Sequence, residues 1–141
     1  MGYLLLLFGL FANKPNCSCI PLGPINDKQY EEYDLIAKGK IVKVSVKAWT
    51  RTIYLNVKTY YKGKKQSQIK IITPSTEGMC GIGPHVGEDW LIFAYNENKS
   101  YRTELCTRTK NLNPKAWDYN KDEIDNDIKF LEEKTIYQGF Y

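Results

Sequence analysis

Apolar and polar residues alternate along most of the middle of the chain. An alternation with a period of two residues is typical of strands that bury one face. Stretches rich in glycine and proline interrupt it, and the longest of them, 76–89, is predicted to be a loop. A hairpin is expected to turn at 96–100. Five strands are predicted in total, at 35–47, 52–60, 68–73, 90–95 and 101–107.

The first predicted strand changes its parity part of the way along. Leu35 and Ala37 share a face with Gly39, whereas Val44 and Val46 have the opposite parity. A parity switch beside a glycine indicates a β-bulge, and a bulged strand bends. A long bent strand can serve both halves of a small barrel. The fold predicted is therefore all-β with flanking helices, built on a small five-stranded barrel of the OB-fold type.

Two segments outside the strands are predicted to be helical. A short helix is expected at 27–33, capped by Asn26 or Asp27. Later in the chain, three apolar residues recur at helical spacing between charged ones: Ile124, Ile128 and Leu131. This amphipathic C-terminal helix is expected to cover an open end of the barrel. Its acidic residues are interpreted as a solvated face: Asp122, Glu123, Asp125 and Asp127.

Composition narrows the class of protein. The 141 residues include 20 Lys and Arg against 16 Asp and Glu, a mildly basic balance that does not by itself mark a nucleic-acid partner. Four lysines lie on exposed parities of the first strand and are read as a solvated face or, alternatively, as a patch for acidic polysaccharide or nucleic acid: Lys38, Lys40, Lys43 and Lys47. No nucleic-acid partner is expected.

Catalytic chemistry has little support in the sequence. His85 is the only histidine, and it lies in the loop rich in glycine and proline without a cluster of Cys or His around it. No Ser-His-Asp set can be assembled. We therefore expect no enzyme and no cofactor.

The chain begins with an uncharged apolar run at 3–12. The run is too short to span a bilayer as a helix, and it fits the apolar core of a secretory signal. Residues 1–12 are expected to be a signal peptide, and a truncated start would explain why no Lys or Arg precedes the run. The alternative is a buried N-terminal strand or helix. Export would place the chain in a periplasmic or extracellular compartment, without a membrane span, where cysteines pair.

The chain contains four cysteines: Cys17, Cys19, Cys80 and Cys106. Cys17 and Cys19 are separated by a single residue and are not expected to bond to each other. Four cysteines can pair in three ways, and this exclusion leaves two. Either pairing would staple the first residues of the folded domain flat across its surface, as an anchor or as a presented binding element.

An ordered set of motifs resembles the N-terminal domain of tissue inhibitors of metalloproteinases, a netrin-like OB barrel. The motifs are Cys17-Ser18-Cys19-Ile20-Pro21, the stretch 33–42, Tyr61-Lys62-Gly63, Met79-Cys80-Gly81, Asp89-Trp90-Leu91-Ile92, and Cys106. The chain is short enough for one domain, expected at 17–137 including the C-terminal helix. The resemblance implies the bonds Cys17–Cys80 and Cys19–Cys106.

The resemblance also implies a mechanism of protease inhibition. The amine and carbonyl of Cys17 would chelate the catalytic zinc of a target protease, and the side chain of Ser18 would enter its S1′ pocket. The inhibitory surface would comprise Cys17, Ser18, Cys19, Ile20, Gly78 and Met79.

This chemistry requires that Cys17 be the first residue of the mature protein. The small residue Ala12 instead favours cleavage after position 12, which leaves 13–16 attached. The alternative function is a non-inhibitory secreted module that binds an extracellular protein or an acidic polysaccharide.

Overall fold

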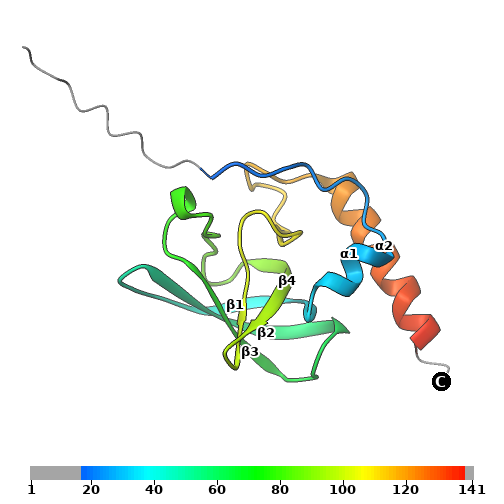
Figure 1. Ribbon diagram of the computed structural model, residues 1–141, viewed down its shortest axis with the longest axis horizontal. Helices are drawn as coiled ribbons and strands as arrows, with labels where there is room; N and C mark the ends of the chain where they lie inside the picture. Colours follow the sequence, from blue (N-terminus) through cyan, green and yellow to red (C-terminus); the bar gives the residue numbers. More distant parts are fainter. Residues whose placement is uncertain (1–16, 139–141) are drawn as a thin grey trace, which may run out of the picture.

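The computed structural model describes residues 17–138 (Figure 1), so the expected signal peptide at 1–12 lies outside the described residues. The described chain is mostly β. Its elements are α1 (Asp27–Glu32), β1 (Leu35–Lys47), β2 (Thr50–Lys62), β3 (Gln68–Pro74), the 3-10 helix η1 (Glu77–Met79), β4 (Asp89–Glu97), β5 (Ser100–Arg102), β6 (Lys110–Asn111) and α2 (Lys121–Gln138).

The six strands form one mixed sheet whose pairing returns to its first strand. Their order is β1-β2-β3-β5-β4-β6, and β1 also pairs with β4, so that five of the strands are bonded in a ring. Among the strands of residues 17–138, β3 and β5 alone run parallel, and every other pair is antiparallel. β1 pairs with two neighbours along the same stretch: residues 36–40 lie opposite both β2 and β4.

The pairing of β1 with β2 confirms the bulge expected beside Gly39. The register against β2 shifts between Lys38 and Gly39, and again between Ile41 and Lys43. At Gly39 the two strands approach so closely that a Cβ atom would lie 2.1 Å from the carbonyl oxygen of Asn56, which only glycine allows. The change of face falls at the shift between Ile41 and Lys43: Ile41 is still buried in the core, and Val44 is the next side chain to pack against it.

The fifth predicted strand, 101–107, is wrong over most of its length. Regular pairing ends at Arg102 and resumes only in β6, which the sequence did not predict. Between them, threonine side chains replace the backbone ladder. The Thr103 hydroxyl donates to the carbonyl oxygen of Phe93 at 2.8 Å, and the Phe93 amide donates to the Thr109 hydroxyl at 2.9 Å. Threonine hydroxyls thus satisfy the backbone hydrogen-bonding groups at the edge of β4, where no neighbouring strand of the described chain pairs with them.

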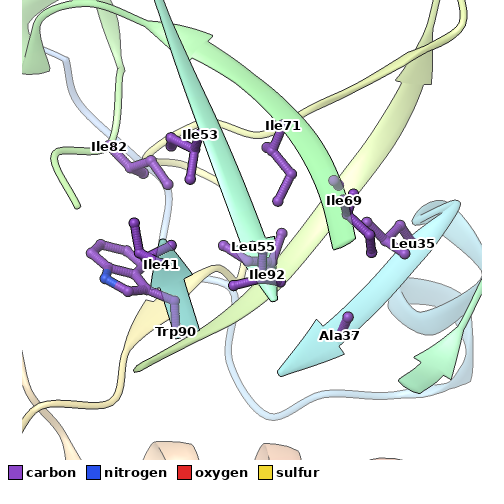
Figure 2. Packing of buried hydrophobic residues seen from close by; sticks show 11 residues of the cluster. Leu35, Ala37, Ile41, Ile53, Leu55, Ile69, Ile71, Ile82, Trp90 and Ile92 are labelled. Carbon is purple, nitrogen blue, oxygen red and sulfur yellow. The ribbon is translucent and has the colours of Figure 1, made fainter. Parts of the chain in front are cut away.

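Apolar side chains pack on both sides of β1 and β4. The first cluster, which we call the ring core, lies between the strands of the ring (Figure 2): Leu35, Ala37, Ile41, Ile53, Leu55, Ile69, Ile71, Ile82, Trp90, Ile92 and Ala94. The second cluster lies under the helices: Ile25, Tyr30, Tyr33, Ile36, Tyr61, Leu91, Phe93 and Leu131. As the apolar spacing predicts, Ile124 and Leu131 of α2 are buried.

Candidate functional site

Two neighbouring disulfides hold the start of the described chain. They join Cys17 to Cys80 and Cys19 to Cys106, with Cα–Cα distances of 5.1 and 5.2 Å. This is the pairing that the resemblance implies. The bonds lie side by side, because the sulfur atoms of Cys17 and Cys106 are 3.6 Å apart. Residues 17–20 have no secondary structure of their own, so the two bonds set their course.

The surface that these bonds position is called the ridge, comprising 17–20 with Gly78 and Met79. The Cys17–Cys80 bond brings η1, and so Met79, beside the N-terminal segment. Ser18 and Cys19 are exposed, and Ile20 is 85% exposed. Met79 is 43% exposed. The structure therefore brings the sequence-predicted residues of the ridge together, with two apolar side chains facing outward on a fixed backbone.

The loop that carries Cys80 is held by the end of β3. The amide of Gly81 donates to the Thr76 carbonyl at 2.9 Å, and a Cβ atom at Gly81 would lie 1.9 Å from the Pro74 carbonyl oxygen. Cys80 itself has a left-handed backbone with φ of 68°, uncommon for a residue other than glycine. Its carbonyl accepts from the Leu105 amide at 2.8 Å, which ties it to the loop of Cys106.

The segment that follows residues 17–20 of the ridge is anchored by polar side chains. The Gln29 side chain, from α1, donates to the Leu22 carbonyl at 2.8 Å. The Arg108 guanidinium donates to the Gly23 carbonyl and to the side-chain oxygen of Gln29, each at 2.9 Å. Ile25 then enters the second cluster. Residues 17–25 are thus fixed at both ends, and we call them the strap.

Arg108 forms a buried ion pair that the sequence analysis missed. Its Nη2 atom lies 2.6 Å from Oδ1 of Asp127, and both side chains are 1% exposed. Lys110 approaches the other carboxylate oxygen at 2.8 Å. The interpretation of Asp127 as part of a solvated face is therefore wrong. The sequence did indicate its burial, because Asp127 lies three residues after Ile124 and four before Leu131, within the apolar stripe of the helix.

The backbone of Arg108 is held as well. Its amide donates to the hydroxyl of Tyr33 at 3.2 Å. Burial, with a further contribution from neighbouring Tyr95, raises the pKa of Tyr33 above its ordinary value, so this hydroxyl stays neutral.

His85 lies close to a carboxylate in the loop that precedes β4. It is exposed, and its Nδ1 atom lies 3.5 Å from a carboxylate oxygen of Glu88. Burial opposes ionisation of Glu88. Hydrogen bonds donated by the His85 amide, the Asn111 side chain and the Trp90 ring outweigh it and hold the Glu88 pKa below its ordinary value. Within 17–138 the one group of three metal-ligand side chains is Cys17, Cys19 and Cys106, whose sulfurs are in disulfides.

No protein-family model and no curated protein matches this chain. Within the described part of the chain, no helix is both long enough and apolar enough to cross a bilayer. Function is therefore inferred from the ridge and from the surfaces around it.

Proposed function

We propose that this chain is a secreted inhibitor of zinc metalloendopeptidases, similar to tissue inhibitors of metalloproteinases, that acts through the ridge. The observation that carries the proposal is the pair of adjacent disulfides, which hold 17–20 without secondary structure while Ser18 and Ile20 face outward. A rigid segment loses little conformational entropy on entering a cleft, which favours tight binding. Disulfides also persist in the oxidising compartments where secreted proteases act.

We further infer that the ring of strands is an OB-like barrel of the netrin-like kind. The closure of β1 onto β4 and the parallel pairing of β3 with β5 support this reading. The bulges in β1 provide the bend that a closed sheet of this size requires. In this account the barrel is a scaffold that carries the ridge on its rim.

The mechanism follows from the chemistry of the target. A catalytic zinc keeps one coordination position open for the water that attacks the substrate. The amine and carbonyl of Cys17 would take that position, and the Ser18 side chain would extend into the adjoining S1′ pocket. Ile20 and Met79 would cover apolar surface at the rim of the cleft. A free α-amino group has a pKa of about 8, so deprotonation for zinc binding costs little at neutral pH.

The inhibitory state depends on where the chain is cleaved. With 13–16 attached, the nitrogen of Cys17 is an amide, which is a very poor zinc ligand, and the added residues occupy the space of the metal. Cleavage directly before Cys17 is therefore required for strong inhibition, whereas the cleavage after Ala12 that the sequence favours would yield a much weaker inhibitor.

The test compares proteins that begin at Cys17 and at Asn13 against a small panel of zinc endopeptidases. We expect the Cys17 form to inhibit at least one member, and the Asn13 form to be weaker by at least a hundredfold. Equal inhibition by the two forms would contradict chelation. Inactivity of the Cys17 form against every member would favour the non-inhibitory binding module instead.

A further inference from the structure

Positive charge is concentrated in one continuous third of the chain. Between Leu35 and Thr76 there are ten Lys and Arg residues and no Asp or Glu, although the whole chain has 16 acidic residues. This segment forms β1, β2 and β3. A segregation of this kind creates a positive potential over one part of the molecule even though the net charge is only +4.

The register of the strands places part of this charge on one outward surface. Lys43 lies opposite Tyr54, and Tyr54 lies opposite Lys70 on the next strand. Their neighbours Ile53 and Ile71 point into the ring core, so this row points away from it. With strands about 4.8 Å apart, Lys43 and Lys70 are separated by roughly 10 Å across the sheet.

The bulge in β1 adds a further cation to this surface. Lys40 and Lys43 are three residues apart and would face opposite ways on a regular strand. The register shift between Ile41 and Lys43 restores them to the same side, since Ile41 is buried while both lysines are exposed. We call the resulting surface the basic face: Lys40, Lys43, Lys47, Lys58 and Lys70.

Most of this charge is not neutralised by the protein. Among the described side chains, two cations of the segment form ion pairs: Lys58 with Asp89 at 2.9 Å, and Lys62 with Glu31 at 3.8 Å. Lys43 instead lies over the ring of Tyr54, at 5.4 Å from its centroid. Exposed like charges repel one another, so an anion that bridges several of them gains binding energy from each.

We propose that the basic face binds a linear sulfated polysaccharide. Lysine ammonium groups are flexible point charges that suit sulfates spaced along a chain. Single-stranded nucleic acid would require a row of free aromatic rings for base stacking. The ring within the basic face, Tyr54, already carries Lys43, and exposed Trp49 lies at the turn at one end of that face. The disulfides agree with this choice, because they persist outside the cytosol, where sulfated glycans occur.

This second surface is independent of the ridge. In Figure 1 the strands β1 to β3 lie in the lower part of the molecule, and the strap crosses the top. A polysaccharide on the basic face would leave the ridge free for a protease. Polysaccharide binding at the basic face does not depend on protease inhibition. The result of the heparin-binding assay therefore leaves the inhibition assay undecided, and the reverse holds as well.

The test measures the affinity of the protein for a heparin oligosaccharide as a function of salt. Lys43→Gln with Lys70→Gln should weaken binding by at least about tenfold. The slope of log affinity against log salt should fall by roughly one to two, since each lost contact removes about 0.7–0.9 in nucleic-acid complexes. The matched control, Lys28→Gln with Lys129→Gln, removes the same charge from exposed positions on the helices and should bind normally.

A second measurement uses the unsubstituted protein. Bound heparin should protect the Lys43 and Lys70 amines from acetylation, read by peptide mass spectrometry, while Lys28 and Lys129 remain reactive. Equal weakening of the two double variants would show that net charge alone drives binding and would overturn the proposal. Tighter binding of a single-stranded oligonucleotide at the same salt would overturn it in favour of nucleic acid.

Discussion

Ile71 and Ile20 have identical side chains but differ completely in solvent exposure. Ile71 is fully buried in the ring core, whereas Ile20 is 85% exposed on the ridge. The ring core owes its shape to many apolar contacts, each of which also contributes to stability. The ridge owes its shape to two disulfides and to the hydrogen bonds that reach Leu22 and Gly23. Side chains on the ridge can therefore vary with little cost to the fold, which suits a binding surface.

The largest effect is expected where the strap meets the buried charges. Asp127→Ala should lower the free energy of unfolding by about 3–5 kcal/mol, because it leaves Arg108 as a buried cation without its carboxylate. Asp125→Ala on the same helix removes only an exposed pair with Lys121 and should cost less than about 1 kcal/mol. Urea unfolding of both variants gives the comparison. Similar values for the two would mean that the Arg108–Asp127 pair contributes no more than a surface pair.

The next effect tests whether α2 belongs to the folded body. Leu131→Ala should cost about 2–5 kcal/mol, because Leu131 is fully buried in the second cluster. Ile136→Ala, at a position 61% exposed on the same helix, should stay within about 0.5 kcal/mol of the parent. Thermal unfolding would measure both. A negligible change for Leu131→Ala would show that α2 is detached from the sheet.

A smaller loss of stability, with a larger loss of function, is expected at the ridge. Cys19→Ser with Cys106→Ser removes the bond that closes an 87-residue separation and should cost about 2–4 kcal/mol. The ring core should still fold, but the ridge would lose one of its two covalent supports. Inhibition measured well below the unfolding midpoint should therefore fall in this variant. Full inhibition there would show that the second bond is not needed to shape the ridge.

The parts of the fold that could be predicted are those with a clear local pattern of apolar and polar residues. The alternation in β1 to β4 is dense enough to place those strands within a few residues, and the apolar stripe of α2 places its buried face. The segment after Arg102 could not be read in this way. Thr103 and Thr109 are good strand residues by type, yet their hydroxyls bond Phe93 in place of a ladder.

Long-range pairings were harder to predict. Nothing local links Arg108 to Asp127, because their attraction depends on how α2 packs. The cysteines illustrate the same limit, since spacing left two connectivities open and only the resemblance favoured one of them. The residues of the ridge were named in advance through that resemblance. Its anchors at Gln29 and Arg108 were not.

The most direct test of the ridge as an inhibitor modifies only the α-amino nitrogen of Cys17 and leaves the fold unchanged. A protein that begins at Cys17 is prepared with a free α-amine and with that amine acetylated, and both are titrated against a zinc endopeptidase that the free form inhibits. The account predicts that acetylation abolishes inhibition while the unfolding midpoint stays the same, because only the zinc ligand is lost. Undiminished inhibition by the acetylated protein would contradict it.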